Sequence, residues 1–514
     1  MPDVAVSSAV RPAARPARRV GVRELVPLLA GWQDRPGVPG YQALADRLRL
    51  LVLDGRLPVH AVLPSERALA TASGTSRTTT TAAYRALREA GFAAAGQGAG
   101  TWTALPNEPA PPSGDPATLP WPVTTTGRRG TADGRGDLSS AALEAPPQVH
   151  AAYVAALADL PRYLPGHGYV TAGLDVLRER VAARYTARGL PTAPDEVLVT
   201  SGAIHGLRLV LGETVARGDR VLVESPTYPL ALDVVRRAGA RPVALPVEDG
   251  WDPDAAAEAL RSTGARAAYL MPDFQNPTGA LMADDVRERL ADVLVRAGCL
   301  VVVDETTADL DLRGPGAVAP APFGAGRRPG PGAGVVHLGS SSKTFWGGLR
   351  VGWVRADRAL VQRLTVARAA DDLASPLVEQ LATAHLLDVV DTLLPQRRAL
   401  VAARCAALRG ALAERLPQWE APVPAGGLVL WCRLPLPRSS ALAAAVRDLG
   451  VTVTPGPRFG PDGAFESRLR IPFARPEADL VAAVGLLARA WHGGAVPGAA
   501  GAGAVPAGAG PAAL

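Results

Sequence analysis

The sequence predicts a multidomain α/β protein, in which a small helical N-terminal domain precedes a larger domain built around a mostly parallel sheet. The chain has 514 residues, which exceeds what a single core accommodates. Residues 104–137 are rich in Pro, Gly and Thr, as is typical of a linker. Residues 138–492 alternate short apolar runs with helical patterns, which favours parallel strands connected by helices.

The remaining boundaries follow from composition. Residues 1–22 are rich in Arg, Pro and Ala, and we expect them to be a disordered basic tail. Residues 23–103 form the first compact domain. Residues 493–514 consist almost entirely of Gly, Ala, Pro and Val, which is typical of a low-complexity, disordered tail.

Composition excludes several classes of protein. Hydrophobic residues make up 48% and charged residues 20%, as in soluble globular proteins. No apolar run approaches the roughly 20 residues of a membrane span, and the N-terminus lacks the apolar stretch of a signal peptide. The cysteines Cys299, Cys405 and Cys432 fit neither a metal-binding spacing nor a disulfide framework. We therefore expect a cytoplasmic protein without a metal site.

The net charge of +6 is confined to the N-terminal part of the chain. Residues 1–104 contain thirteen Arg and seven Asp or Glu, whereas basic and acidic residues balance in the remainder. This asymmetry favours a polyanionic partner for the first domain. The alternative is that the arginines of the tail, among them Arg11 and Arg15, raise the count without a binding role.

Lys343 is the only lysine among the 54 Lys and Arg residues. This composition indicates a bias that replaces lysine by arginine wherever a plain positive charge suffices. A lysine amine, unlike a guanidinium, can lose its proton and form a Schiff base. Lys343 is therefore a candidate for covalent chemistry, and the alternative is one surface lysine retained by chance.

Residues 40–90 show the spacing of a helix-turn-helix. Apolar residues from Leu44 to Val52 recur at helical intervals, and Gly55 ends this helix. Ser65 is a suitable N-cap for the next helix. A short turn at residues 73–75 then leads to another helix that begins near Ser76.

This last helix has the polarity of a DNA recognition helix. Its first residues can hydrogen-bond to phosphates or base edges, and its later residues, such as Ala83 and Leu87, form an apolar face. The first residues are Ser76, Arg77, Thr78 and Thr79. The glycine-rich sequence AAAGQGAGTWTA at residues 93–104 predicts a hairpin-like wing.

The ordered set PSER, SRTT, AYRALREAGF and GQGAGT resembles the GntR family of winged helix-turn-helix regulators. The resemblance implies double-stranded operator DNA as a partner. The residues that it places at the DNA are Ser65, Arg67, Ser76, Arg77, Thr78, Thr79 and, through the wing backbone, Gly98. The alternative is a helical-hairpin interaction module without DNA binding.

Residues 335–353, with the sequence VVHLGSSSKTFWGGLRVGW, place Lys343 directly after an apolar strand and a serine cluster. This pattern resembles the S-x-x-K…R motif of fold-type I enzymes, the aminotransferase class, which hold pyridoxal 5′-phosphate (PLP) on the lysine. The resemblance implies that Lys343 is the catalytic residue and cofactor anchor. It also implies that Ser340 and Arg350 face the phosphate.

Further elements occur in the order of that class. The strand CLVVVD ends in Asp304, whose carboxylate is expected to keep the pyridine nitrogen protonated. The resemblance assigns Asn276, in NPTG, to the 3′-oxygen of PLP. Gly202 and Ala203 follow a strand and begin a helix, so they offer backbone N–H groups to the phosphate.

By the same resemblance, Tyr228 stacks on the cofactor ring and Arg470 binds the carboxylate of a substrate or effector. Each element also has a simpler interpretation. Asp304 is suited to cap a helix, NPTG to form a turn, and Arg470 to pair with a structural acid. For His205 we expect packing rather than catalysis.

One departure concerns a tyrosine that follows the aspartate in many relatives and hydrogen-bonds to the PLP 3′-oxygen. Here Thr306 and Thr307 stand in that region, and the run after Asp304 contains no tyrosine. We expect cofactor binding to survive this change. Efficient transamination is not expected, although residual aminotransferase activity stays open.

A GntR-type reader followed by an aminotransferase-like domain is the layout of the MocR/GabR subfamily. The resemblance implies a head-to-tail homodimer and a transcription regulator that senses an amine or amino-acid-type effector through the Lys343 aldimine. One alternative is a functional PLP-dependent aminotransferase with an accessory DNA-binding domain. Another is a DNA-binding scaffold without a cofactor, in which Lys343 is incidental.

Overall fold

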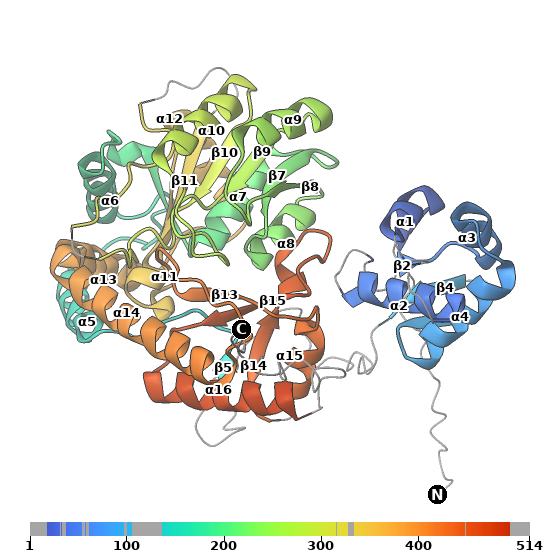
Figure 1. The fold of residues 1–514 in the computed structure, drawn as a ribbon. Coiled ribbons are helices and arrows are strands. Elements are labelled where there is room, and N and C mark those ends of the chain that lie inside the picture. The colour runs from blue at the N-terminus through green and yellow to red at the C-terminus, as the bar shows by residue number, and fades with distance from the viewer. Residues whose placement is uncertain are drawn as a thin grey trace, which may run out of the picture. The chain divides into compact units, whose positions relative to one another are not determined.

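The computed structural model describes residues 18–30, 32, 38–53, 57, 61–96, 100–104, 136–314, 316–326, 334–447 and 449–493. Contacts divide the chain into two compact units (Figure 1). The smaller unit comprises Met1–Thr126 and Asp462–Glu466, and the larger unit comprises Gly127–Pro461 and Ser467–Leu514.

The described part of the smaller unit combines helices with a small sheet. Its helices are α1 (Val22–Leu28), α2 (Gly40–Leu53), α3 (Glu66–Ser73) and α4 (Arg77–Glu89), and its strands are β1 (Arg18–Arg19), β2 (Ala61–Val62), β3 (Ala93–Gly96) and β4 (Gly100–Thr103). The strands lie in the order β1-β2-β4-β3. One apolar core, which includes Leu44, Tyr84 and Leu87, joins the helices to the sheet.

The predicted helix-turn-helix is confirmed in α3 and α4. Ser65 Oγ accepts a hydrogen bond from the backbone N–H of Ala68 at 3.2 Å, and Ser76 Oγ accepts one from Thr79 at 3.0 Å. Ser65 is therefore the N-cap that the sequence predicted, and Ser76 caps the helix that was expected to begin near it. Gly74 ends α3 in the left-handed conformation, with φ of 66°. The predicted wing is the antiparallel pair β3–β4.

The prediction of a disordered tail over residues 1–22 is wrong for its last residues. Arg18–Arg19 pair with β2 as strand β1, and Val22 begins α1. The physical reason is Val20, which is 3% exposed and packs into the core. Asp137, which we placed at the end of the linker, is the first residue of a strand. Residues 1–17, Gly55, the wing tip with Gly98, residues 105–135 and residues 494–514 lie outside the described residues.

A mostly parallel sheet forms the centre of the larger unit, as predicted (Figure 1). Its strands, in spatial order, are β6 (Val197–Thr200), β12 (Gly352–Arg355), β11 (Gly334–Ser340), β10 (Leu300–Asp304), β9 (Ala267–Leu270), β7 (Arg220–Ser225) and β8 (Arg241–Pro246). Strand β12 runs antiparallel to both of its neighbours, and the other strands are parallel to one another.

Helices cover both faces of this sheet, which explains why its strands are apolar throughout. On one face, α7 (Ala203–Thr214), α8 (Pro229–Arg237) and α12 (Arg358–Arg368) pack against side chains such as Val302. On the other face, α9 (Pro253–Thr263) and α10 (Asp284–Arg296) pack against side chains such as Val303.

A second sheet, with the order β13-β15-β14-β5, forms a smaller part of this unit. Its strands are β13 (Val429–Arg433), β15 (Arg468–Pro472), β14 (Thr452–Pro455) and β5 (Asp137–Leu138), and α14 (Val390–Arg415), α15 (Ser439–Arg447) and α16 (Glu477–His492) share its core. Strand β5 is the first strand described in the larger unit, and it pairs in parallel with β14, near the end of the chain.

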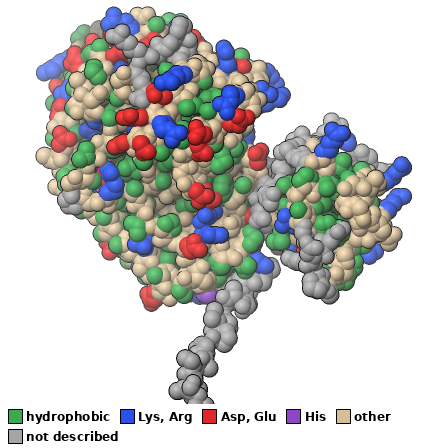
Figure 2. All heavy atoms as spheres, turned by 45° about the horizontal axis from the view of Figure 1, so that its top comes forward, with side chains coloured by type: hydrophobic (Ala, Val, Ile, Leu, Met, Phe, Trp, Pro, Cys, Tyr) green, Lys and Arg blue, Asp and Glu red, His purple; other side chains and the backbone are tan. Residues whose placement is uncertain are grey.

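The remaining elements surround these sheets. They are α5 (Pro147–Asp159), α6 (Asp175–Ala187), α11 (Ser341–Thr344), α13 (Leu377–Asp388) and the short 3-10 helices at Leu160–Arg162, Pro194–Glu196, Gly347–Leu349 and Gly456–Phe459. Among the described residues, no helix is long and apolar enough to cross a membrane. Figure 2 shows basic and acidic side chains interspersed over the visible face of the larger unit. On the visible face of the smaller unit, the charged side chains are mainly basic.

Candidate functional site

Five segments of the predicted cofactor site meet at the carboxyl edge of the central sheet. Asp304 ends β10 and Ser340 ends β11, while Gly202, Tyr228 and Asn276 follow β6, β7 and β9. Because these strands are parallel, their carboxyl ends share one edge, which is where open α/β sheets bind ligands. The structure therefore brings together residues that lie up to 138 positions apart in the chain.

Lys343 lies in the short helix α11 directly after β11. Ser340 caps this helix by accepting a hydrogen bond from the N–H of Ser342 at 3.2 Å. The Lys343 Nζ donates to the backbone carbonyl of Ala141 at 2.6 Å. Burial and the charge of Arg470 lower the pKa of the amine to about 8, although Asp304 opposes this shift. A larger fraction of the amine is thus neutral, and so nucleophilic, near neutral pH.

The turn after β6 provides an anion cradle. Gly202 has φ of 95°, which favours glycine, and it precedes the N-terminus of α7 at Ala203. The Arg350 side chain donates to the carbonyl of Ser201 at 2.9 Å. A Cβ at position 202 would lie 3.1 Å from the Arg350 guanidinium. Free backbone N–H groups at a helix start, beside a guanidinium, form a suitable site for a phosphate.

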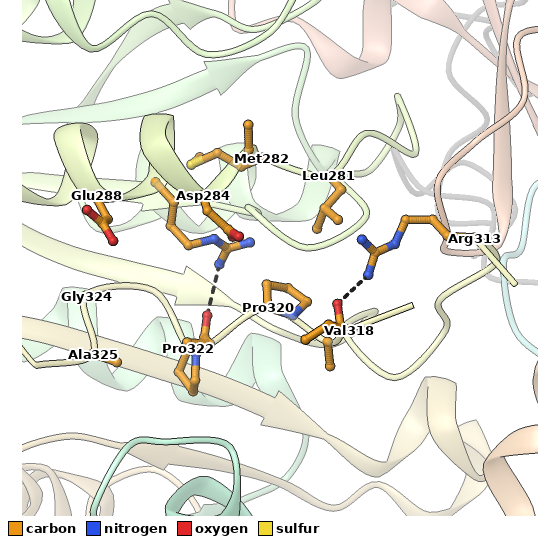
Figure 3. Close-up of a pocket in the computed structure, with 14 residues that line it drawn as sticks. Leu281, Met282, Asp284, Glu288, Arg313, Val318, Pro320, Pro322, Gly324 and Ala325 are labelled. Carbon is orange, nitrogen blue, oxygen red and sulfur yellow. Dashed lines mark hydrogen bonds between the residues drawn. The ribbon is translucent and has the colours of Figure 1, made fainter. Parts of the chain in front are cut away.

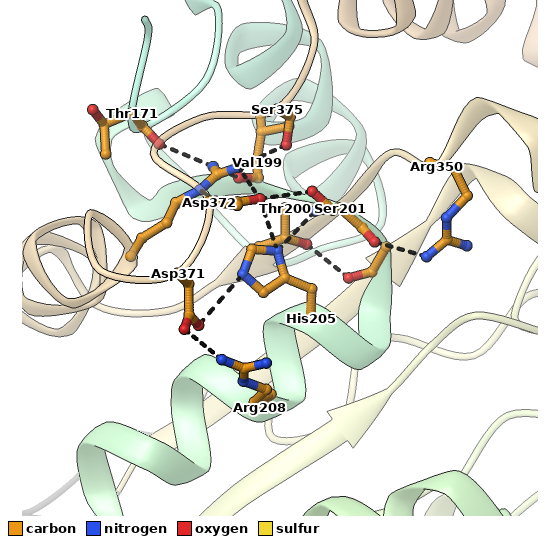
Figure 4. A network of polar contacts seen from close by, with 12 residues as sticks. Thr171, Val199, Thr200, Ser201, His205, Arg208, Arg350, Asp371, Asp372 and Ser375 are labelled. Atoms are coloured by element: carbon orange, nitrogen blue, oxygen red, sulfur yellow. Dashed lines mark hydrogen bonds and ion pairs between the residues drawn. The ribbon is translucent and has the colours of Figure 1, made fainter. Parts of the chain in front are cut away.

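A network of hydrogen bonds and ion pairs holds Ser201, in the turn after β6 (Figure 4). His205 Nδ1 accepts a hydrogen bond from the N–H of Ser201 at 3.1 Å, and Ser201 Oγ donates to Asp372 at 2.8 Å. The buried Arg368 also binds Asp372, at 2.7 Å. Burial lowers the pKa of His205, with Asp372 opposing, so its imidazole is neutral. His205 is therefore an acceptor in a polar network, and packing rather than catalysis stays the prediction for it.

Asp304 is 3% exposed, and its carboxylate is held by two donors. Tyr269 in β9 donates its hydroxyl to Oδ2 at 2.6 Å, and the N–H of Thr306 donates to Oδ1 at 2.9 Å. Burial raises the pKa of the carboxyl, while the hydrogen bonds from Tyr269 and Thr306 lower it. Residues 306–309 form a turn rather than a helix, which removes the helix-cap interpretation.

The NPTG element forms a turn and also presents its asparagine. Gln275 fixes the turn by accepting from the N–H of Thr278 at 3.0 Å and by donating to the carbonyl of Pro226 at 2.7 Å. Asn276 Oδ1 is buried and has no hydrogen-bond partner among the described residues. A buried amide of this kind calls for a polar ligand atom beside it.

Tyr228 directly precedes α8, and charged residues of the predicted site influence the pKa of its hydroxyl. Burial raises its pKa to about 12; the charges of Arg470 and Arg350 oppose this, and Asp304 adds to it. The phenol therefore stays protonated and can serve as an aromatic face and donor.

Arg470 lies in β15 and is 1% exposed. It donates to the carbonyl of Ser139 and contacts Thr454 Oγ1 at 3.5 Å, and its guanidinium lies 5.1 Å from the ring centre of Phe459. Burial lowers its pKa to about 10. Ser139 and Ala141, which hold Arg470 and Lys343, belong to the same short segment after β5.

The threonines that replace the usual tyrosine have structural contacts. Thr307 Oγ1 donates to the carbonyl of Asp273 at 2.9 Å, and Thr306 binds Asp304 through its N–H. Sequence reasoning missed Tyr269, Ser139 and Ala141. Only Tyr269 carried a signal, a polar residue inside an otherwise apolar strand.

The predicted DNA-contacting residues lie at the start of the two helices of the helix-turn-helix. Arg67, Ser76, Arg77 and Thr78 are exposed, as is Ser65. Thr79 is partly buried and its Oγ1 hydrogen-bonds to Ser76 Oγ at 2.8 Å. Later in α4, Ala83, Tyr84 and Leu87 are buried.

A cavity of about 560 Å³ lies elsewhere, between the start of α10 and residues 318–325 (Figure 3). Its arginines are engaged, since Arg287 pairs with Asp273 at 2.5 Å and Arg313 donates to the Val318 carbonyl at 2.8 Å. None of the predicted cofactor residues lines this cavity. Among the described residues, no cluster of three or more His, Cys, Asp or Glu is arranged to hold a metal ion.

Residues 135–486 match the family model described as aminotransferase class I and II. The chain belongs to this family. Residues 40–102 match the model described as bacterial regulatory proteins, gntR family. A GntR-type helix-turn-helix is thus fused to an aminotransferase domain, which confirms the predicted fold class.

Relatives of this aminotransferase-family chain include both enzymes and regulators. LysN, an α-aminoadipate aminotransferase of Thermus thermophilus, matches with a TM-score of 0.64 and 30% identity, over 70% of this chain and 93% of that one. The uncharacterized HTH-type transcriptional regulator YisV of Bacillus subtilis is 26% identical over 434 residues, which cover 78% of this chain and 86% of YisV. The probable rhizopine catabolism regulatory protein MocR of Rhizobium meliloti is 30% identical over 348 residues, 62% of this chain and 65% of MocR.

PLP is the cofactor of this family, and the residues present fit it. The site offers an amine of lowered pKa, a buried carboxylate, an unpaired amide oxygen and an anion cradle. The expected cofactor and the resemblance to MocR-type regulators are confirmed, because the fused architecture is that of such regulators.

Lys343 is expected to react with an amine-acylating reagent with an apparent pKa of about 8 rather than 10.5. Since only the neutral amine reacts, the rate should rise with pH up to about 8 and then level off. The chain has one lysine, so mass spectrometry of a single peptide reports this titration. Arg470→Gln should raise the apparent pKa, because it removes a neighbouring positive charge. A rate that keeps rising to pH 10 would contradict the prediction.

Gly202→Ala is expected to weaken PLP binding at least about tenfold, because a Cβ strains a left-handed backbone and displaces Arg350. Gly189→Ala is the matched control, since Gly189 has φ of 89° with nothing within 4 Å of its missing Cβ. Both variants should lose similar thermal stability. Fluorescence titration with PLP should separate them, and equal affinities would argue against the cradle.

Proposed function

We propose that the protein is a PLP-dependent, effector-responsive transcription regulator that binds double-stranded operator DNA. The observation that carries this proposal is the presence, in one chain, of an exposed recognition-helix start and a partly buried lysine of lowered pKa in a PLP-type site. DNA contacts are proposed for Ser65, Arg67, Ser76, Arg77, Thr78, Thr79 and Gly98. Arginine and hydroxyl side chains at a helix start suit both phosphates and base edges.

For the cofactor, the proposal assigns one task to each residue. Lys343 anchors PLP, Asp304 pairs with the ring nitrogen, Asn276 binds the 3′-oxygen and Tyr228 stacks on the ring. Ser340, Arg350 and the N–H groups of Gly202 and Ala203 hold the phosphate. When bound, PLP supplies an electrophilic carbon that exchanges reversibly between the lysine and an incoming amine.

Arg470 is proposed to bind the acidic group of an amine or amino-acid-type effector. Its buried guanidinium offers donors in a fixed fork, which suits a carboxylate. Low water access strengthens this attraction. The amine of the effector would thus exchange with Lys343, and its acidic group would bind Arg470.

The segment after β5 offers a physical route from this site to the linker. The carbonyls of Ala141 and Ser139 accept hydrogen bonds from Lys343 and Arg470. An effector that occupies those two side chains competes with both carbonyls and so releases the segment that continues the linker. Such competition changes DNA affinity by the difference in binding energy between the two states, typically about 1–3 kcal/mol.

The second candidate is a PLP-dependent aminotransferase with an accessory DNA-binding domain. Lys343, Asp304, Asn276 and Arg470 favour it, as does the likeness to LysN. The regulator is preferred because Thr307 takes up a structural contact in the region where relatives have a tyrosine. Steady turnover of an amino acid with a 2-oxo acid would support the enzyme instead.

The regulator is proposed to act in the cytoplasm as a head-to-tail homodimer whose subunits share their active sites. Support comes from an apolar face on α5 and the segment that follows it. Val154, Leu157, Leu164 and Tyr169 are each more than half exposed there. A surface of this kind favours association with a second copy.

Arg77→Ala and Lys343→Arg are expected to separate the two activities. Arg77→Ala should weaken operator binding by about 1–3 kcal/mol and leave the visible absorbance of bound PLP intact. Lys343→Arg should abolish that absorbance, because a guanidinium cannot form the imine. Arg85→Ala, which removes an exposed arginine later in α4, is the control for DNA binding.

Fluorescence anisotropy with DNA from upstream of the neighbouring genes measures the first activity, with and without candidate amines. If the protein binds no DNA under any of these conditions, the regulator proposal fails. If Lys343→Arg keeps the absorbance band, the anchor is assigned to the wrong residue.

The double variant Leu157→Asp, Leu164→Asp is expected to sediment as a monomer where the unmodified protein sediments as a dimer, because two buried carboxylates would oppose an apolar interface. Val423→Asp, at a position 70% exposed outside this face, should leave the dimer intact. Analytical ultracentrifugation measures both. A monomeric unmodified protein would refute the proposed dimer.

A further inference from the structure

Tyr269 is the closest partner of the carboxylate expected to meet the cofactor ring. Its hydroxyl lies 2.6 Å from Asp304 Oδ2, and both side chains are buried. Tyr269 stands in β9 beside β10, so the two residues lie on adjacent parallel strands although 35 positions separate them in sequence. The surrounding strand residues are apolar, which makes this hydroxyl the polar exception in β9.

The hydroxyl can act only as a donor toward an ionised carboxylate. Burial and the negative charge of Asp304 raise the pKa of Tyr269 well above its ordinary value, so the proton stays on the phenol. Thr306 supplies the second donor, to Oδ1. Each carboxylate oxygen accepts more than one hydrogen bond, so Asp304 retains acceptor capacity for a ligand.

Other charged and titratable groups around Asp304 make this donor necessary. The positive charge of Lys343, in α11, stabilises the ionised form of Asp304. The carboxyl of Glu224, in β7, and the phenol of Tyr228, before α8, also interact electrostatically with Asp304, and neither stabilises its negative charge. Burial raises the pKa of Asp304, and the Tyr269 hydrogen bond is the largest opposing influence. A carboxylate in such a position would otherwise take up a proton.

We propose that Tyr269 is a positioning residue for the cofactor: its hydroxyl keeps Asp304 ionised and oriented to pair with the protonated pyridine nitrogen of PLP. The inference rests on the proposed PLP site. It also separates Tyr269 from the tyrosine that many relatives place after the aspartate, because Tyr269 binds the aspartate itself. In this chain, Tyr269 of β9 thus supports the residue that pairs with the ring nitrogen. Thr306 and Thr307 occupy the positions after Asp304, where many relatives have a tyrosine for the 3′-oxygen.

The test compares Tyr269→Phe with the unmodified protein in binding to two cofactors. The first is PLP, and the second is deazapyridoxal phosphate, in which a carbon replaces the ring nitrogen. Tyr269→Phe should weaken PLP binding by about tenfold to a hundredfold, as expected for a lost hydrogen bond to a charged group. It should leave the affinity for the carbon analogue unchanged within about twofold, because that ring offers nothing for Asp304 to pair with.

Tyr185→Phe is the matched control. Tyr185 also buries its hydroxyl against a carboxylate, Glu305 Oε2, at 2.7 Å, one residue after Asp304. Both variants therefore lose one buried phenol-to-carboxylate hydrogen bond in the larger unit. Tyr185→Phe should lower thermal stability comparably and weaken both cofactors equally or not at all.

The outcomes separate this inference from the function on which it rests. If the unmodified protein binds PLP and Tyr269→Phe loses affinity for both cofactors alike, Tyr269 has only a structural role and the inference is overturned. Unchanged PLP affinity in Tyr269→Phe overturns it as well. An unmodified protein that binds neither cofactor refutes the PLP site itself, and the inference with it. Selective loss of PLP binding supports the positioning role.

Discussion

Asp304, Lys343 and Arg470 bring three ionisable groups out of water at one edge of the central sheet, and the surrounding structure must compensate each of them. Tyr269 and Thr306 donate to Asp304, while the carbonyls of Ala141 and Ser139 accept from Lys343 and Arg470. A buried charge costs several kcal/mol unless hydrogen bonds or opposite charges offset that cost. The site is therefore held by fixed dipoles, which compensate the buried charges.

This requirement gives the proposed regulator its means of response. Lys343 and Arg470 are held by a single segment, which contains Ser139 and Ala141 and follows β5. Since β5 belongs to the C-terminal sheet, this segment is packed at one end and hydrogen-bonded to the site at the other. We propose that ligand binding at the site is linked to order in this segment through these hydrogen bonds. The lowered pKa of Lys343 makes the amine available for reversible exchange near neutral pH.

Much of the fold followed from local patterns. Ser65 as an N-cap and the turn at residues 73–75 predicted where α3 begins and where α4 follows it, since a cap depends on residues three positions away. Unbroken apolar runs predicted parallel strands covered on both faces. Strand β1 was missed because arginines at its two positions conceal the one buried residue, Val20, that follows them. Strand β5 was missed because two residues carry no periodicity, and their partner strand lies more than 300 positions away.

The sequence by itself predicted the chemistry proposed for this protein: a single lysine after a serine cluster, an aspartate at a strand end and a recognition helix with a polar start. These are local features, and their resemblance to the aminotransferase class and the GntR family implies PLP and DNA. Only the tertiary structure decided how the charges are satisfied. Tyr269 reaches Asp304 across adjacent strands, His205 accepts from the N–H of Ser201 in the turn after β6, and Ala141 meets Lys343 from a position 202 residues earlier. Such contacts depend on sheet order and burial, which bring distant residues within hydrogen-bond distance and make each unpaired polar group costly.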